Sequence, residues 1–305
     1  MGKTVIERFP SREKRCGASV ALATWRIGLS LARRRWQAHP VIVVDIGGAL
    51  VRADLRTPLG LGLYRYGFCD LESRVLTRLL RPGDAFIDCG ANVGLFSLIG
   101  ATAVGPTGHV LACEPGPGTM ALLEANVALN AFETLESHPV ALSERSGTAR
   151  FVVFENGSGL ASFAPEGGGG TTIEVAVTTL DDLTSSLGER VALVKLDIEG
   201  AEVKALLGAH DLITRAAPLF FVEVEPEHLA RQGASVDDLN RILEPHGYEA
   251  YAITVDGSLV KLSGSWRPRD AAHPNLVLAS PSRAERLSAL TAGVTGATGQ
   301  ASEGT

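Results

Sequence analysis

The feature that most constrains the fold of this chain is the alternation of short apolar segments with helical patterns between residues 85 and 225. The apolar segments are continuous, and each ends in a glycine or a carboxylate: residues 85–90, 109–114, 192–197 and 219–225. Continuous apolar strands are typical of a parallel sheet, because helices then bury both of its faces. The sequence therefore predicts an α/β domain with a Rossmann-like, doubly wound sheet.

Segments on either side of this alternation predict additions to the sheet. Gly47-Gly48 separates two apolar segments, which is typical of a β-hairpin. A β-hairpin excursion is expected from residues 148–155 and 171–177, joined by the glycine-rich residues 157–170. The last apolar segments, 248–253 and 275–280, predict an antiparallel edge on an otherwise mostly parallel sheet.

Composition divides the chain into three parts. Residues 1–38 are basic, and residues 17–36 have the spacing of an amphipathic N-terminal helix that packs on the domain or in a homo-oligomer. A membrane-surface helix is the alternative. Residues 39–282 form the α/β domain. Residues 283–305 end in a stretch rich in Gly, Ala, Ser and Thr, which predicts a disordered tail.

Charge and cysteine usage exclude several classes of protein. The formal net charge is −6, which argues against a nucleic-acid partner. The sequence contains neither an apolar run of about 18 residues, as a membrane span needs, nor a clean signal peptide. The four cysteines, Cys16, Cys69, Cys89 and Cys113, are scattered, so neither a zinc site nor a disulfide framework is indicated. A cytoplasmic protein is expected.

The first strand of the alternation leads into a glycine loop, FIDCGANVG, at residues 86–94. Gly90 and Gly94 permit a tight turn and the close approach of a ligand. Asn92 stands where a dinucleotide fingerprint has its second glycine, and its side chain would obstruct a pyrophosphate. Glu114, at the next strand end, is placed to accept hydrogen bonds from a ribose. A helix cap for Asp88 and a solvated strand end for Glu114 are the structural alternatives.

Five motifs together resemble the FkbM family of methyltransferases over residues 40–280. They are the glycine loop, VLACEPGP (110–117), NVALN (126–130), TLDDL (179–183) and VKLDIEGAE (194–202). The resemblance implies a methyltransferase that binds S-adenosylmethionine and methylates hydroxyl groups of sugars or polyketide-type natural products. The implied cofactor positions are Asp88, Gly90, Asn92, Gly94, Glu114, Pro115, Ala141 and Leu142. In that reading Asp88 faces the ammonium group of the cofactor.

Carboxylates at two strand ends are the candidates for chemistry. Methylation of an alcohol releases a proton, so a base or a metal ion assists it. We expect Asp197, Glu199 and Glu223 to converge on the transferred methyl group, since their strands should be neighbours. Their oxygens would also suit Mg²⁺, and the sequence leaves the metal open. Glu202 is expected to face a helix dipole, and Lys195 to pair with an acid across the sheet or to extend to solvent.

Two alternatives remain for the activity. A nicotinamide-dependent oxidoreductase would use the same type of sheet, although Asn92 speaks against a pyrophosphate. A methyltransferase of this fold would also serve a carbon or a carboxylate acceptor. In each case the expected partner is a small-molecule acceptor.

Overall fold

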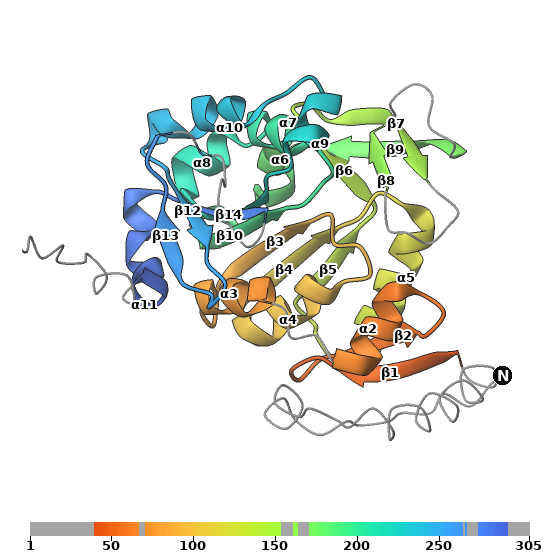
Figure 1. The fold of residues 1–305 in the computed structure, drawn as a ribbon. Coiled ribbons are helices and arrows are strands. Elements are labelled where there is room, and N and C mark those ends of the chain that lie inside the picture. Colours follow the sequence, from red (N-terminus) through yellow and green to blue (C-terminus); the bar gives the residue numbers. More distant parts are fainter. Residues whose placement is uncertain are drawn as a thin grey trace, which may run out of the picture.

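The computed structural model describes residues 40–66, 71–153, 161–163, 171–264, 266 and 274–291 (Figure 1). The basic helix expected within residues 1–38 lies outside these residues, as does most of the glycine-rich segment 157–170.

An eight-stranded sheet forms the centre of the molecule, in the order β13-β12-β14-β11-β10-β3-β4-β5. The strands from β11 to β5 are parallel, which confirms the predicted doubly wound core. Strand β14 runs antiparallel between β11 and β12, so the antiparallel end contains β14, β12 and β13. The strand bounds are β3 (Ala85–Cys89), β4 (His109–Cys113), β5 (Leu135–His138), β10 (Val191–Leu196), β11 (Leu219–Glu223), β12 (Glu249–Ile253), β13 (Leu259–Lys261) and β14 (Asn275–Ala279).

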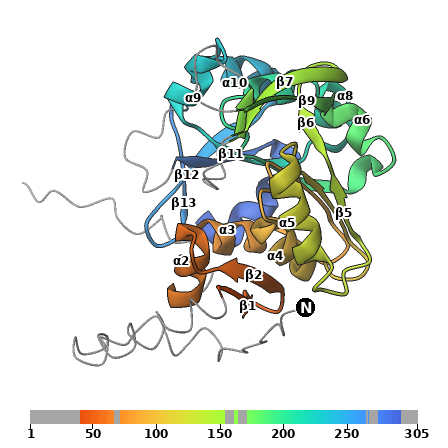
Figure 2. The same ribbon diagram turned by 90° about the vertical axis from the view of Figure 1, so that its right-hand side faces the viewer.

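Helices cover both faces of this sheet (Figures 1 and 2). Successive strand residues point to opposite faces, so Phe86 joins one buried core and Ile87 the other. The first core lies under α3 (Leu71–Leu79), α4 (Leu95–Val104) and α5 (Pro117–Val127). The second lies under α6 (Leu180–Thr184), α7 (Glu202–Leu207), α8 (His210–Ala216), α9 (Pro226–Arg231) and α10 (Val236–Leu243).

A second sheet of four strands contains the predicted excursion. Its order is β6-β9-β7-β8, with bounds β6 (Val140–Leu142), β7 (Gly147–Val153), β8 (Ala161–Phe163) and β9 (Thr171–Thr178). Strands β7 and β9 are antiparallel, as predicted. Residues 135–142 form two strands, because the chain leaves the main sheet after β5 and enters the second sheet as β6.

Both ends of the described chain pack on the domain. Strands β1 (Val41–Asp45) and β2 (Leu50–Asp54) form the predicted hairpin, followed by α2 (Pro58–Tyr66). At the other end, η4 (Pro281–Leu287) and α11 (Ser288–Thr291) bury Leu287 and Leu290. Arg286 forms a bidentate ion pair with the buried Asp84. Residues 283–291 are thus helical and packed on the domain, which contradicts the predicted disorder for this part of the tail.

Candidate active site

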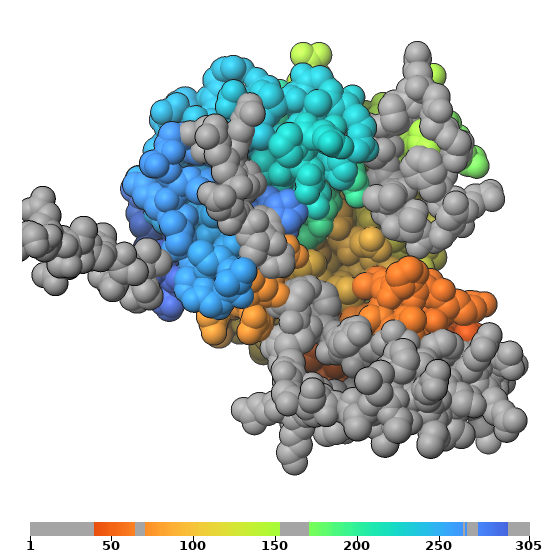
Figure 3. All heavy atoms as spheres, viewed as in Figure 1, coloured from red at the N-terminus to blue at the C-terminus, as the bar shows by residue number. Residues whose placement is uncertain are grey.

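A cavity of about 210 Å³ lies at the carboxyl ends of β3, β4 and β10. The chain runs from β3 to β4 and β5 on one side and then returns to β10 on the other, so the cavity lies where the strand order reverses. Ligands of open α/β sheets bind at this topological position. Figure 3 shows that on this face the segment 85–100 lies deeper than α2 below it and α7 to α10 above it.

Gly90 brings two walls of the cavity into contact. Its φ is +77°, and a Cβ at this position would lie 2.0 Å from the carbonyl oxygen of Asp197. The N–H groups of Gly90 and Ala91 both donate to the carbonyl of Cys113. Asn92 is also left-handed, with a φ of 52°, which asparagine tolerates better than most residues. The motif therefore fixes a backbone that other residues would strain.

Glu114 forms the opposite side of this turn and is buried. Its Oε2 accepts the N–H of Asn92 at 3.1 Å, and its Oε1 accepts the N–H of Gly116 at 2.8 Å. Burial raises the pKa of Glu114, while the two backbone hydrogen bonds work to lower it. A solvated strand end is therefore excluded. Each oxygen keeps a lone pair, and the side chain lines the cavity, so this wall fits the hydroxyl groups of a ribose.

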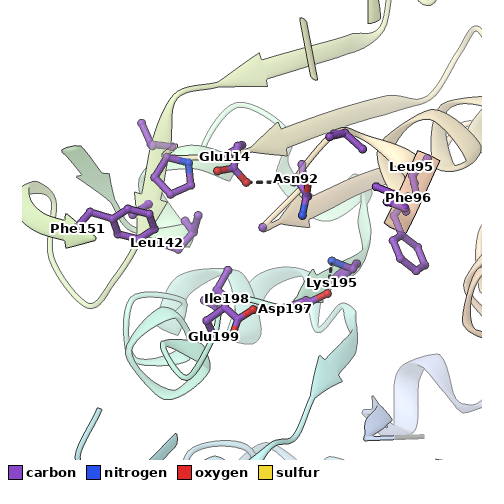
Figure 4. Close-up of a pocket in the computed structure, with 17 residues that line it drawn as sticks. Asn92, Leu95, Phe96, Glu114, Leu142, Phe151, Lys195, Asp197, Ile198 and Glu199 are labelled. Carbon is purple, nitrogen blue, oxygen red and sulfur yellow. Dashed lines mark hydrogen bonds and ion pairs between the residues drawn. The ribbon is translucent and has the colours of Figure 1, made fainter. Parts of the chain in front are cut away.

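The second sheet supplies an apolar end to the cavity. Ala141 and Leu142 of β6 line it together with Pro115, and their contact with a cofactor stays a prediction. Phe151 of β7 lies beside Leu142 (Figure 4), although nothing in the motifs indicated it. Flat apolar surroundings of this kind fit an aromatic base.

Asp88 lies beneath the cavity and is not one of its lining residues. It is completely buried, and it accepts a hydrogen bond from Ser97 Oγ at 2.6 Å. It does not cap α4, whose N-cap residue is Gly94. Gly94 packs against Leu123 and also lies outside the lining. Contact between Asp88 and a bound ligand stays a prediction.

Lys195 pairs with two carboxylates, Asp88 outside the cavity lining and Asp197 in the cavity wall. Its Nζ lies 3.4 Å from Oδ1 of Asp88 and 3.2 Å from Oδ2 of Asp197, and the side chain is 3% exposed. Burial works to lower the pKa of Lys195, but the charges of Asp197 and Asp88 outweigh it and raise that pKa. Of the two predicted roles, pairing with an acid across the sheet is confirmed. Nζ also lies 5.0 Å from the centre of the Phe96 ring.

Asp197 and Glu199 line the wall that faces Glu114 (Figure 4). Glu199 has a φ of 56°, an uncommon conformation for a non-glycine residue. Glu202 holds this loop, because its Oε1 accepts the N–H groups of Ile198 at 3.0 Å and Gly200 at 3.2 Å. Burial raises the pKa of Glu202 to about 7. Its side chain therefore fixes the loop, a role beyond the expected interaction with a helix dipole.

Glu223 approaches this wall through a histidine that the sequence analysis missed. His228 Nδ1 lies 3.2 Å from Oε2 of Glu199 and 4.0 Å from Oε2 of Glu223. Burial raises the pKa of Glu223 to about 8, and the nearby charges of Asp197 and Glu199 add to this effect. Glu223 does not line the cavity. In the sequence His228 lies five positions after Glu223, in the helix that follows β11, but no spacing links it to Glu199.

Metal ligation has no support in the described residues. Among them, no group of three His, Cys, Asp or Glu side chains is placed to hold a metal ion. The expectation of Mg²⁺ therefore rests on the residue types alone. Within the same residues, no helix is long and apolar enough to cross a membrane.

The model of the Methyltransferase FkbM domain matches residues 88–250, which are 163 of the 305 residues. The chain belongs to the FkbM methyltransferase family. Methyltransferase sdnD of Sordaria araneosa is 30% identical over 162 residues. The 31-O-demethyl-FK506 methyltransferase FkbM of Streptomyces tacrolimicus is 28% identical over 162 residues. Each match covers 43% of this chain and 62% of the relative.

The chain is also similar to a much longer protein and to a solved structure. AMB antimetabolite synthetase AmbE of Pseudomonas aeruginosa is 27% identical over 208 residues, which are 56% of this chain and 10% of that protein. The crystal structure of Methyltransferase FkbM from Methylobacillus flagellatus KT aligns with a TM-score of 0.41 and 20% identity. It covers 72% of this chain and 53% of that one.

Proposed function

We propose that this chain transfers a methyl group from S-adenosylmethionine to a hydroxyl group of a small metabolite. The observation that carries the proposal is a single cavity with the hydrogen-bonded Glu114 on one wall and the carboxylates of Asp197 and Glu199 on the other. When bound, S-adenosylmethionine supplies a methyl group that its sulfonium has already activated. The protein then has to position the acceptor and remove its proton.

The first wall supports a nucleoside cofactor. Glu114 is held by two backbone N–H groups, so its remaining lone pairs have a fixed direction toward the cavity. Ala141, Leu142 and Phe151 supply apolar surface for the base. Asn92 occupies the place where a pyrophosphate would need a glycine, which disfavours the nicotinamide alternative.

The second wall supports proton removal. Asp197 is engaged in an ion pair with Lys195. Within the described residues, the ion-pair partner of Glu199 is His228 rather than a lysine. Burial raises the pKa of Glu199, so its carboxylate accepts a proton more readily than an exposed one. We therefore assign proton acceptance to Glu199, and orientation of the acceptor to Asp197. Glu223 does not line the cavity, and its carboxylate lies close enough to Asp197 and Glu199 to interact with their charges.

The acceptor is proposed to be an uncharged hydroxyl compound of the sugar or polyketide type. One relative is named for a 31-O-demethyl-FK506 substrate. In this chain, Leu59 of α2 and Phe96 of α4 add apolar surface to the cavity. The carboxylates on the opposite wall would repel an anionic acceptor.

Calorimetry with S-adenosylmethionine and NADH in parallel tests the cofactor. The wild type should bind S-adenosylmethionine alone. Glu114→Ala should weaken that binding by about 10- to 100-fold, as expected for the loss of hydrogen bonds to a charged group. Glu124→Gln, which alters an exposed carboxylate on α5, is the matched control and should bind normally. NADH binding, or a wild type that binds neither compound, would overturn the proposal.

A transfer assay with radiolabelled S-adenosylmethionine then tests the acceptor class. Sugar and polyketide hydroxyls should become labelled, and Glu199→Gln should slow the reaction about 100-fold or more, the usual contribution of a general base. Label that enters only carbon or carboxylate acceptors would contradict hydroxyl methylation while leaving the cofactor assignment intact.

A further inference from the structure

His228 has a defined place between the cavity and the surface. It belongs to α9, which starts at Pro226, three residues after the end of β11 at Glu223, and its N–H donates to the carbonyl of Glu225 at 3.0 Å. The backbone of α9 packs tightly on the loop of Glu199, because a Cβ on Gly200 would lie 2.2 Å from the carbonyl oxygen of His228. The two segments therefore hold a fixed relative position.

The imidazole ring has one buried and one accessible side. Its Nδ1 is buried and makes no hydrogen bond within the described part of the chain. The side chain as a whole is nevertheless 24% exposed. The closest carboxylate oxygen at ion-pair distance is Oε2 of Glu199, at 3.2 Å, and that of Glu223 follows at 4.0 Å. Nδ1 thus points toward the carboxylates of Glu199 and Glu223. Asp197 and Glu199 form the acidic wall of the cavity.

We propose that His228 is the positioning residue for Glu199. A small rotation of either side chain turns the 3.2 Å contact between Nδ1 and Oε2 into an Nδ1–H···Oε2 hydrogen bond that holds the carboxylate at the cavity, and the imidazolium charge stabilises that carboxylate. The inference rests on the proposed function, in which Glu199 accepts the proton of the acceptor. A carboxylate on a left-handed backbone, with its loop fixed by Glu202, still needs a partner for its own oxygens. His228 Nδ1 is the donor within reach of Oε2.

The electrostatic surroundings support a second effect of His228. Burial raises the pKa of Glu199, and the positive charge of His228 works against that rise. The other charged groups around the pair come from the loop after β10, from α7, from the end of β11 and from α9: Asp197, Glu202, Glu223, Glu225 and Arg231. Most of these are acidic, so loss of His228 would leave Glu199 harder to deprotonate.

Two substitutions separate the hydrogen bond from the charge. Asn retains a donor near the position of Nδ1 but carries no charge, whereas Ala removes both. His228→Ala should lower kcat about tenfold or more while the KM for S-adenosylmethionine stays within about twofold. His228→Asn should recover most of kcat. In both variants the acidic limb of the rate profile should move to higher pH, because the positive charge is lost. Glu227→Gln, an exposed neighbour on α9, is the matched control.

A measurement without cofactor or acceptor keeps this inference separate from the proposed function. In protein labelled with ¹³C at glutamate side-chain carboxyls, the resonance that disappears in Glu199→Gln identifies Glu199. Its titration should move to higher pH in both His228 variants and stay unchanged in Glu227→Gln, with thermal melting confirming that each variant is folded. An unchanged titration, or a kcat for His228→Ala equal to that of the wild type, would overturn the inference. Failure of the wild type to bind S-adenosylmethionine would instead overturn the proposed function.

Discussion

Glu114 and Glu199 line facing walls of one cavity, and burial raises the pKa of both, yet their partners differ in kind. Glu114 accepts two backbone N–H groups, so its oxygens are fixed by the same turn that contains the glycine motif. Glu199 faces the titratable His228 and has further carboxylates around it. Backbone partners cannot change charge, which suits binding. A titratable partner such as the one beside Glu199 can change charge, and this property suits proton transfer.

The two walls are nevertheless coupled through buried contacts. Lys195 joins Asp88, under the glycine loop, to Asp197 on the acidic wall. Gly90 of the first wall touches the backbone of Asp197 directly. The difference between the walls therefore depends on Lys195 and Gly90. Lys195 offsets the negative charges of Asp88 and Asp197, and Gly90 keeps the two walls in contact.

The largest effect is expected from removing the buried cation. Lys195→Met keeps the volume but leaves Asp88 and Asp197 without their partner, and breaking a buried ion pair costs about 3–5 kcal/mol. Urea denaturation should show this loss in the free energy of unfolding. Lys261→Met is the control, because Lys261 pairs with Glu249 at the surface, where such pairs contribute about 1 kcal/mol or less. Equal losses in the two variants would show that Lys195 is not the link between the walls.

A smaller loss is expected where the two walls touch. Gly90→Ala places a Cβ against the carbonyl of Asp197 and forces a left-handed alanine. Strain and overpacking together should cost about 2–4 kcal/mol, and binding of S-adenosylmethionine should weaken with it. Gly118→Ala in α5 is the matched control, since a Cβ there has no atom within 4 Å among its surroundings. Denaturation and calorimetry on both variants measure the effect. A Gly90→Ala variant with wild-type stability would contradict the contact.

The parts of this molecule that follow from local pattern could be predicted from the sequence. The parallel strands, the hairpin at Gly47-Gly48 and the pairing of Lys195 depend on apolar continuity, turn residues and the cost of a buried charge. The division of residues 135–142 between two sheets could not, because each strand is too short to show which neighbour it pairs with.

Long-range contacts set the remaining limits of the sequence analysis. Residues 283–291 are ordered by Arg286, which binds Asp84 some 200 positions earlier, while composition alone predicted disorder. His228 escaped notice since its partners come from two other segments, and no spacing within its own helix indicates them.

The smallest effect concerns the pH dependence of stability, where Glu223, which lies behind the wall of Asp197 and Glu199, should behave oppositely to a surface ion pair. The pKa of Glu223 is raised from 4.5 to about 8, so the folded chain binds a proton that the unfolded chain has released. The associated stability is present below about pH 4.5 and is lost as the pH rises through about 8. Glu223→Gln should therefore be more stable than the wild type at pH 8.5, by an amount on the order of 1–3 kcal/mol. This advantage should vanish near pH 4.5.

Glu249 provides the contrast for this measurement. Its hydrogen bonds to Lys261 and Tyr251 lower its pKa, so its contribution is present at neutral pH and is lost as the pH falls. Glu249→Gln should be less stable than the wild type at pH 8.5, and the difference should shrink in acid. Thermal melting of both variants between pH 4.5 and pH 9 gives the two slopes. If Glu223→Gln lost stability at high pH as Glu249→Gln does, Glu223 would be a paired carboxylate with a lowered pKa, like Glu249, and the raised pKa of Glu223 would be wrong.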